Sequence, residues 1–221
     1  MQKRLKNKKA IILGGSKGIG KEIAKSLKKI YINVHGLSSK EINTSDLNSV
    51  KSFCKKYKKT DILVLNSGGP PNIEFKKITI EDWQKYFNQL FLGFVLILKK
   101  LKINNNGYIF YISSSIIKEP TENLIISSSL RVAFSSILKS LSLNYSKNNV
   151  SIINIAPGPF KTNRAKKLVK NMKLFEKSLP KGKIGNPKEI GDFVGAIVEN
   201  KISYISGTTI YFDGNISKSF I

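Results

Sequence analysis

The chain has 221 residues, 41% of them apolar and 24% charged, which is the balance of one globular domain with its own core. It carries one cysteine, Cys54, and one histidine, His35. This composition excludes an intrachain disulfide, a cysteine-rich zinc site and a centre built from several histidines.

The formal charge is +24, from 38 basic and 14 acidic residues. Only Arg4, Arg131 and Arg164 are arginines, and the remaining basic residues are lysines scattered along the chain. Nucleic-acid sites usually contact base edges and phosphates with arginine forks. The lysine, isoleucine and asparagine excess also fits AT-rich codons, so we do not expect nucleic acid to be a main partner.

The most apolar continuous stretch, residues 90–98, is nine residues long, whereas a membrane helix needs about 20. The basic N-terminus leads into a short apolar run that ends at a glycine turn, whereas a secretory signal needs an apolar region of roughly 7–15 residues. These features predict a cytoplasmic protein without a membrane helix.

Short β-branched runs alternate with longer amphipathic stretches along the chain. Strands are predicted at residues 10–13, 33–37, 61–65, 108–112, 151–155 and 208–212. Helices are predicted at residues 19–30, 79–98, 127–148 and 187–200, the second capped by Thr79 and Asp82. This alternation predicts a single α/β domain over residues 1–221, a doubly wound parallel sheet with helices on both faces.

A glycine-rich turn, Gly14-Gly15-Ser16-Lys17-Gly18-Ile19-Gly20, separates the first predicted strand from the first helix. Glycines there permit a tight turn and the close approach of a pyrophosphate, and the helix N-terminus offers free N–H groups to it. The spacing is not Gly-x-Gly-x-x-Gly, so by itself the turn also fits an ordinary strand-to-helix connection.

Several motifs together resemble the short-chain dehydrogenase/reductase family, in particular its members similar to 3-oxoacyl-[acyl-carrier-protein] reductase. The glycine turn resembles the family's TGxxxGIG, with Leu13 where threonine is usual. Further matches are Asp46-Leu47, Leu65-Asn66-Ser67-Gly68, Ala156-Pro157-Gly158 with Thr162, Ile184-Gly185-Asn186-Pro187-Lys188-Glu189-Ile190, Ser203-Tyr204-Ile205-Ser206-Gly207 and Phe212-Asp213-Gly214. The resemblance spans residues 10–214 and implies a Rossmann fold.

The resemblance also implies an oxidoreductase that transfers hydride between a nicotinamide dinucleotide and a carbonyl or alcohol substrate. The substrate would be a small molecule or an acyl thioester, and the protein would be a homodimer or homotetramer that packs its fourth and fifth helices. The implied dinucleotide-binding residues are Gly14, Ser16, Lys17, Gly18, Ile19, Gly20, Ser38, Ser39, Asp46, Leu47, Asn66, Gly68, Arg131, Pro157, Gly158 and Thr162.

The end of the second predicted strand bears on the choice of cofactor. An acid there binds the ribose 2′-hydroxyl of NAD, whereas a basic residue accommodates the 2′-phosphate of NADP. The sequence reads Leu37-Ser38-Ser39-Lys40 with no acid before Glu41, and Lys17 lies in the glycine turn. We expect a 2′-phosphate to meet hydroxyl and ammonium donors and no nearby carboxylate, which favours NADP(H) over NAD(H). Alternatively, Lys17 and Lys40 only reflect the general lysine excess.

Only seven residues, 39–45, separate the second strand from Asp46. The family usually has a helix and most of a strand in this place. Seven residues are too few for an ordinary crossover helix, so we expect this element to be trimmed or replaced by a loop.

The catalytic positions depart from the family pattern. The family uses a tyrosine as proton donor, a lysine four residues later, a serine thirteen residues before the tyrosine and an asparagine on the preceding helix. The match at Lys139-Ser140-Leu141 fixes the register. It places these four positions at Ser127, Arg131, Ser114 and Leu90, so only the serine is retained.

Three interpretations remain open. In the first, the protein is a reductase in which Ser114 and Ser127 hold the carbonyl, Arg131 stabilises negative charge, and a water or another group, such as Tyr111, supplies the proton. In the second, the protein binds a dinucleotide without hydride transfer and acts as a regulatory module. In the third, the substitutions mark a different chemistry, to which the unusual Gly68-Gly69-Pro70-Pro71 and residues 118–123 would contribute.

The lysine-rich segment 161–183 corresponds to the mobile substrate lid of the family. A basic lid could attract an acidic substrate, such as an acyl chain on a phosphopantetheine carrier or coenzyme A. A solvated helix in a lysine-rich protein gives the same pattern.

Overall fold

The structure is a computed structural model that describes residues 8–30 and 33–219. Its strands form one parallel sheet in the order β2-β1-β3-β4-β5-β6. The strands are β1 (Lys9–Leu13), β2 (Asn33–Leu37), β3 (Lys59–Leu65), β4 (Lys102–Ile112), β5 (Ser151–Pro157) and β6 (Thr208–Phe212). This arrangement confirms the predicted doubly wound α/β fold.

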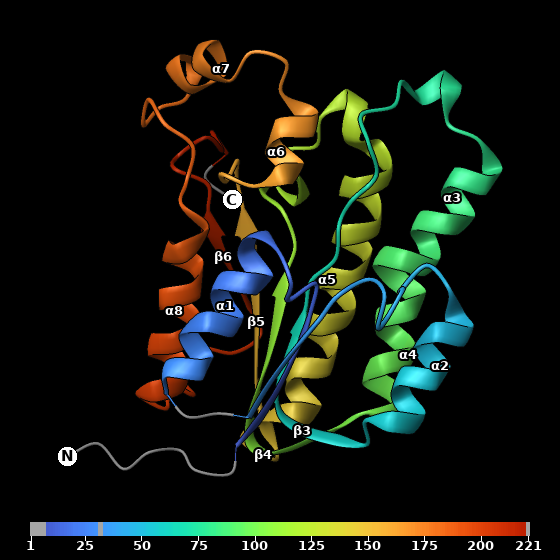
Figure 1. The fold of residues 1–221 in the computed structure, drawn as a ribbon, viewed down its shortest axis with the longest axis vertical. Helices are drawn as coiled ribbons and strands as arrows, with labels where there is room; N and C mark the ends of the chain where they lie inside the picture. The colour runs from blue at the N-terminus through green and yellow to red at the C-terminus, as the bar shows by residue number, and fades with distance from the viewer. Residues whose placement is uncertain (1–7, 31–32, 220–221) are drawn as a thin grey trace.

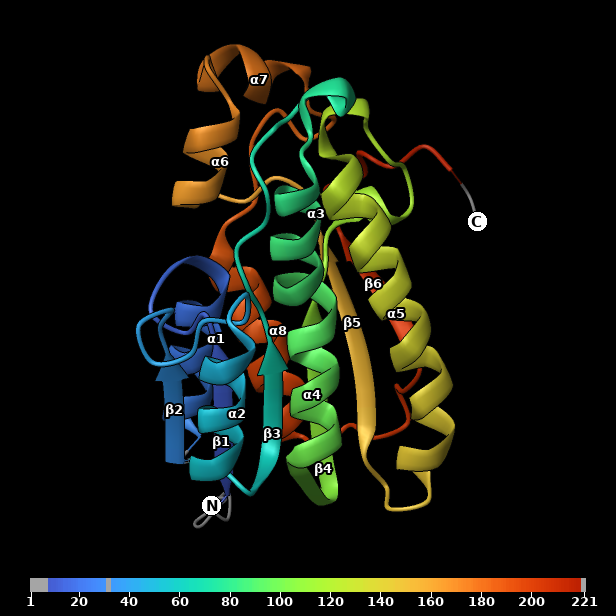
Figure 2. The ribbon, with the colours of Figure 1, turned by 90° about the vertical axis from the view of Figure 1, so that its right-hand side faces the viewer.

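Helices cover both faces of the sheet (Figure 1). They are α1 (Gly18–Lys29), α2 (Leu47–Lys56), α3 (Ile80–Phe87), α4 (Gly93–Lys100), α5 (Ile125–Ser146), α6 (Asn163–Leu168), α7 (Met172–Ser178) and α8 (Pro187–Glu199). Helices α1 and α8 lie side by side on one face, and α2, α4 and α5 cover the other. The short helices α6 and α7 lie beyond the carboxyl ends of the strands (Figure 2).

The connection from β2 to β3 follows the expectation of a shortened crossover. Residues 38–46 form a loop without helix or strand, and β2 is an edge strand. The crossover is made instead by α2, which the sequence analysis did not predict. Asp46 caps this helix by accepting a hydrogen bond from the Asn48 backbone N–H at 2.9 Å. Val50, Phe53 and Cys54 form its buried face at helical spacing.

The helix predicted over residues 79–98 is divided into two. Its start is confirmed, because the Thr79 hydroxyl and the Asp82 carboxylate form a reciprocal capping box. A π-helical turn, η2 (Asn88–Leu92), then separates α3 from α4. Leu90 lies in this turn with its side chain fully buried. Isolated π-turns within helices are frequent near functional sites, and η2 packs against α5.

The sequence analysis found no stretch long and apolar enough for a membrane helix, and helix α5 differs from that expectation. Together with the turn before it (Glu122–Ser146), it is long and apolar enough to cross a membrane by length and composition, although the longest unbroken apolar run is much shorter. Its buried face carries Phe134 and Leu138, which belong to the core between the sheet and the helices α2, α4 and α5. The helix thus has the packing of a core helix in a doubly wound fold.

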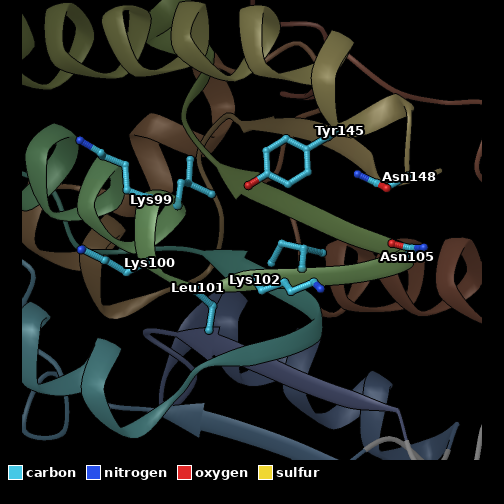
Figure 3. Close-up of a pocket in the computed structure, with 9 residues that line it drawn as sticks. Lys99, Lys100, Leu101, Lys102, Asn105, Tyr145 and Asn148 are labelled. Carbon is cyan, nitrogen blue, oxygen red and sulfur yellow. The ribbon is translucent and has the colours of Figure 1, made fainter.

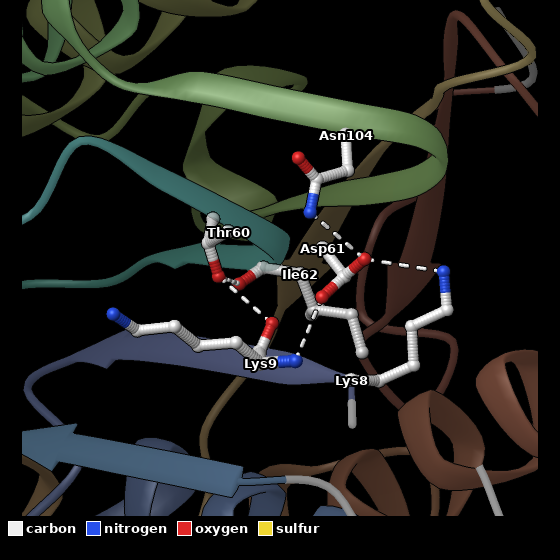
Figure 4. Close-up of polar contacts among 6 residues, drawn as sticks. All are labelled: Lys8, Lys9, Thr60, Asp61, Ile62 and Asn104. Carbon is white, nitrogen blue, oxygen red and sulfur yellow. Dashed lines mark hydrogen bonds and ion pairs between the residues drawn. The ribbon is translucent and has the colours of Figure 1, made fainter. Parts of the chain in front are cut away.

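A polar network joins the starts of three strands at the edge opposite the glycine turn (Figure 4). The Asp61 carboxylate accepts hydrogen bonds from the Lys9 backbone N–H at 2.8 Å, the Asn104 amide at 3.0 Å and the Lys8 ammonium at 3.1 Å. Burial opposes ionisation of Asp61, but these bonds and the Lys8 charge outweigh it, so its pKa lies below the ordinary value.

We expect Asp61→Asn to lower the free energy of unfolding by about 1–3 kcal/mol near neutral pH, because the amide supplies one fewer acceptor and no charge. The folded-state pKa of Asp61 is depressed, so its stabilisation is present above the unfolded pKa of about 4 and lost as the pH falls through the folded value. The difference in the free energy of unfolding between wild type and Asp61→Asn should therefore become smaller in acid. Urea unfolding at several pH values measures it.

Asp192→Asn is the matched control, because Asp192 pairs with Lys188 on the exposed surface of α8. Exposed pairs of this kind contribute about 0.5 kcal/mol or less. An equal effect of the two substitutions, or a pH-independent effect at Asp61, would contradict the role of the buried carboxylate.

Candidate functional site

The glycine turn is closed so tightly that side chains do not fit. Gly14 has a φ of +61°, in the left-handed region that favours glycine. A Cβ on Gly15 would lie 2.5 Å from the Gly36 Cα, and a Cβ on Gly20 would lie 2.3 Å from the Gly14 carbonyl oxygen. The Asn66 amide donates to that same carbonyl oxygen at 3.4 Å. Asn66, at the end of β3, thus holds the turn in place.

The N-terminus of α1 fits a phosphate. Lys17 is the N-cap, and its side chain makes no capping hydrogen bond to the first N–H groups of the helix, those of Gly18, Ile19 and Gly20. The side chains of Ser16 and Lys17 are exposed beside them. Such an uncapped N-terminus after a glycine turn binds anionic oxygens well. These observations fit the dinucleotide pyrophosphate expected from the sequence.

The start of α6 lies on this turn. The Thr162 methyl carbon is 3.2 Å from the place where a Cβ on Gly18 would stand. The Thr162 hydroxyl caps α6 by accepting from the Ala165 backbone N–H at 3.3 Å. Segment 161–183 therefore reaches over the carboxyl ends of the strands, where the sequence analysis expected a lid.

At the end of β2, the structure differs from the expectation that no carboxylate lies nearby. Glu41 folds back so that its carboxylate accepts a hydrogen bond from the Ser38 backbone N–H at 2.8 Å. The hydrogen bonds from the Ser38 backbone and side chain lower the Glu41 pKa. The prediction of no carboxylate near the 2′-phosphate position was therefore wrong. The chain turn at Ser39 and Lys40 brings the Glu41 carboxylate back to the strand end.

The remaining predicted cofactor residues lie at the same edge of the sheet. Asp46 is exposed and Leu47 half-buried at the start of α2. The Gly68 carbonyl accepts a hydrogen bond from the Gln89 amide at 2.8 Å. After Pro157, the Gly158 backbone N–H donates to the Phe212 carbonyl at 2.9 Å, which joins the ends of β5 and β6.

Two of the three predicted catalytic residues are in direct contact. Ser127 and Arg131 lie one turn apart on α5, with only 3% and 5% of their surfaces exposed. The Arg131 Nε donates to the Ser127 Oγ at 3.2 Å, and its Nη1 donates to the Ile112 carbonyl at 3.0 Å. Ile112 ends β4, two residues before Ser114. Arg131 thus fastens α5 to the strand that carries Ser114.

The segment Gly69-Pro70 lies directly over this pair. A Cβ on Gly69 would stand 3.5 Å from both the Arg131 Nη2 and the Ser127 Oγ, and 3.2 Å from the Nη2 of Arg164. Arg164, on α6, donates from Nη1 to the Gly69 carbonyl at 2.8 Å and from Nη2 to the Pro70 carbonyl. The sequence analysis did not select Arg164 as a site residue. Its rarity as one of three arginines was the available signal.

The site is strongly positive. Burial and then the Arg131 charge lower the pKa of Arg164. In the part of the chain that the structure describes, no carboxylate forms an ion pair with either arginine. A site with two guanidinium groups and a hydroxyl can hold an anion or stabilise a developing oxyanion.

Tyr111 lies near Arg131, but it is enclosed in the core. Its ring is fully buried against Phe94 and Phe134, with centroid distances of 6.0 and 4.9 Å. Burial raises its pKa, and the nearby Arg131 opposes that rise only in part. Its hydroxyl makes no hydrogen bond of normal geometry. Tyr111 therefore packs on its strand.

A pocket of about 430 Å³ lies elsewhere, at the amino end of β4 (Figure 3). It is lined by Leu98, Lys99, Lys100, Leu101, Lys102, Ile103, Asn105, Tyr145 and Asn148. None of the predicted site residues lines it. The cofactor and catalytic positions gather at the opposite edge of the sheet, as ligand sites in open α/β folds do.

Comparison with known proteins identifies the family of the chain. Residues 43–216 match the family model described as enoyl-(acyl carrier protein) reductase. The chain is 26% identical over 235 residues to 3-oxoacyl-[acyl-carrier-protein] reductase FabG of Rickettsia conorii, covering 96% of this chain and 98% of that protein. It is 27% identical over 252 residues to glucose 1-dehydrogenase 2 of Bacillus subtilis, covering 98% and 97%.

Solved structures show the same fold. A short-chain dehydrogenase from Burkholderia cenocepacia in complex with NADP has a TM-score of 0.85 at 18% identity, covering 96% of this chain and 98% of that one. A blue fluorescent protein from a metagenomic library in complex with NADPH has a TM-score of 0.87 at 16% identity, covering 97% and 100%. With the family model matching most of its length, the chain belongs to the short-chain dehydrogenase/reductase family of oxidoreductases.

Proposed function

We propose that the protein is an NADP(H)-dependent reductase that interconverts a carbonyl compound, of 3-oxoacyl type, and its alcohol. The contact of Arg131 with Ser127 at the carboxyl edge of the sheet carries this proposal. It supports the proposal because both side chains can donate to a carbonyl oxygen and Arg131 also contacts Ile112, two residues before Ser114. A similar relative, FabG of Rickettsia conorii, is named as a 3-oxoacyl reductase.

The residues present fit a nicotinamide dinucleotide, which supplies hydride when bound. Ser114 and Ser127 hold the carbonyl oxygen, and the Arg131 guanidinium stabilises the negative charge that develops there. The Ser127 hydroxyl is a far weaker acid than a phenol, whose pKa is near 10, so it is a poor proton donor. Because the Tyr111 hydroxyl is fully buried in the core, we expect water to supply the proton that completes the alcohol.

The cofactor preference depends on opposing charges at the end of β2. Lys17 and Lys40 favour a 2′-phosphate, and Glu41 opposes it. We expect Glu41→Gln to raise the ratio of NADPH to NADH affinity by about two- to fivefold, the range of exposed charge interactions. Fluorescence titration with both nucleotides measures the ratio. Glu199→Gln, at the far end of α8, is the control and should leave the ratio unchanged. A lower ratio of NADPH to NADH affinity in Glu41→Gln than in wild type would contradict the proposed role of the Glu41 charge.

The alternative is a dinucleotide-binding regulatory protein without hydride transfer, favoured by the replacement of tyrosine, lysine and asparagine at Ser127, Arg131 and Leu90. Two measurements on the purified protein separate these functions. One titrates NADPH and NADH, and the other follows NADPH oxidation with a panel of 3-oxoacyl thioesters, ketones and aldehydes. Tight binding without turnover selects the alternative, and absence of dinucleotide binding contradicts both.

We also propose that the protein is cytoplasmic and forms a homodimer or homotetramer through α4 and α5. Val132 and Leu143 on α5 expose 44% and 75% of their surfaces, although both are apolar. Apolar residues on one helix face support association between copies. The expected substrate remains a small molecule or acyl thioester, and nucleic acid is not among the proposed partners.

A further inference from the structure

We propose that Arg131 and Arg164 together bind a carboxylate of the substrate, so that, of the two substrate classes proposed above, the protein prefers a small-molecule oxo acid to an acyl thioester or another neutral ester. This inference rests on the proposed function, because it concerns the substrate of the same site. It extends that function by naming a charged group on the substrate and a residue on α6, Arg164, that recognises it.

The first observation is the convergence of donors beside Gly69. The Nη2 atoms of Arg131 and Arg164 and the Ser127 Oγ lie 3.5, 3.2 and 3.5 Å from the point where a Cβ would stand on this glycine. Gly69 therefore packs against donors from α5 and α6 together, and a side chain at this position would press on them. An anion held between the two guanidinium groups would meet donors from both helices. A larger residue at position 69 would displace them.

The second observation is the uncompensated charge. Arg131 is 5% exposed, and its Nε and Nη1 donate only to neutral oxygens, those of Ser127 and Ile112. Arg164 donates to the Gly69 and Pro70 carbonyls, which are also neutral. Buried charges are normally paired, because their desolvation is otherwise costly. A bound anion supplies the counter-charge that the described residues lack.

The third observation is the choice of arginine in a lysine-rich chain. Of the 38 basic residues only three are arginines, and two of them meet here. The planar guanidinium fork matches a carboxylate with two parallel hydrogen bonds, which lysine cannot make. The dinucleotide phosphates have a separate place at the N-terminus of α1. The arginine pair lies at the Ser127 side of the site, where the reacting carbonyl is held.

The test compares 3-oxobutanoate with its methyl ester, which has the same ketone and no charge. Calorimetric titration of the protein without cofactor, at fixed ionic strength, measures binding separately from turnover. We expect the acid to bind at least about tenfold more tightly than the ester, the effect of hydrogen bonds to a charged group. Arg164→Gln should remove this preference, and Arg164→Lys should retain part of it.

Lys51→Gln is the control, because it removes the same charge from the exposed surface of α2 and should leave the preference intact. Thermal unfolding with and without 3-oxobutanoate is a second readout. The acid should raise the Tm of wild type and of Lys51→Gln, and should not raise that of folded Arg164→Gln.

Equal affinity of the wild-type protein for acid and ester would overturn the inference. An equal loss of the preference for the acid in Arg164→Gln and Lys51→Gln would overturn it as well. Tighter binding of inorganic phosphate than of the acid would overturn its assignment to a carboxylate. The outcome is separate from that of the proposed function. Reduction of the ester as efficient as that of the acid would retain the reductase and reject the inference. Selective binding of the acid without any NADPH oxidation would reject the reductase and retain the carboxylate site.

Discussion

Arg131→Gln is expected to lower kcat/KM for carbonyl reduction by about 100- to 1000-fold, the usual effect of removing one oxyanion donor. The physical reason is that Arg131 is the buried cation in contact with Ser127 and with the strand end that leads to Ser114. NADPH oxidation with a reducible substrate measures the change. Arg131→Lys keeps the charge and loses the fork, so we expect an intermediate loss.

Urea unfolding of both variants distinguishes a chemical effect from a loss of the fold. Activity of Arg131→Gln within about threefold of wild type, well inside the change expected for a lost oxyanion donor, would reject a catalytic role for the guanidinium. Ser127→Tyr combined with Arg131→Lys tests the same question from the other direction. The regulatory alternative expects activity to appear, whereas a mechanism built on serine and arginine expects it to fall. We expect it to fall, because Ser127 is buried under the Gly69 segment and leaves little room for a phenol.

Gly20→Ala is expected to weaken dinucleotide binding by at least about tenfold and to destabilise the fold. Alanine usually favours a helix over glycine by about 1 kcal/mol. Here its Cβ would lie 2.3 Å from the Gly14 carbonyl oxygen and 2.8 Å from the Asn66 amide nitrogen. Overpacking against backbone costs about 1–3 kcal/mol or more, so the clash exceeds the gain in propensity. The turn must open, which moves the N–H groups expected to hold the pyrophosphate.

Fluorescence titration with NADPH and urea unfolding measure the two effects. Gly68→Ala is the control for stability, because no heavy atom lies within 4 Å of the added Cβ and the backbone there does not require glycine. We expect it to change the free energy of unfolding by no more than about 0.5 kcal/mol. Equal stability of the two alanine variants would contradict the account of the turn.

The strands and long helices were predictable because their apolar positions follow the period of each element. β6 has the predicted bounds, and the capping box at Thr79 starts α3 as expected. Helix α2 was missed because it is short and rich in polar residues, and most of its stability comes from packing against the sheet. The π-turn at Leu90 was not predictable either, because the local pattern is that of one continuous helix.

Some features of the candidate site were likewise predictable from the sequence, and others were not. The glycine turn and the positions of Ser114, Ser127 and Arg131 follow from motif spacing along the chain. The Glu41 carboxylate at Ser38 depends on how an irregular loop folds back, which no periodicity specifies. Arg164 reaches Gly69 across 95 residues of sequence, and such a contact exists only once α6 lies over the strand ends.

By itself, the sequence determined the doubly wound fold, and it predicted a dinucleotide turn and a catalytic set that keeps one family residue, Ser114. These features are local, because periodicity, glycine spacing and residue identity act over a few neighbours. The tertiary structure alone decided that Arg131 and Arg164 meet beside Gly69 and that no carboxylate of the described residues forms an ion pair with them. Basic residues occur throughout this chain, but only packing buries Arg131, half-buries Arg164 and so strengthens the electrostatic interactions of their charges.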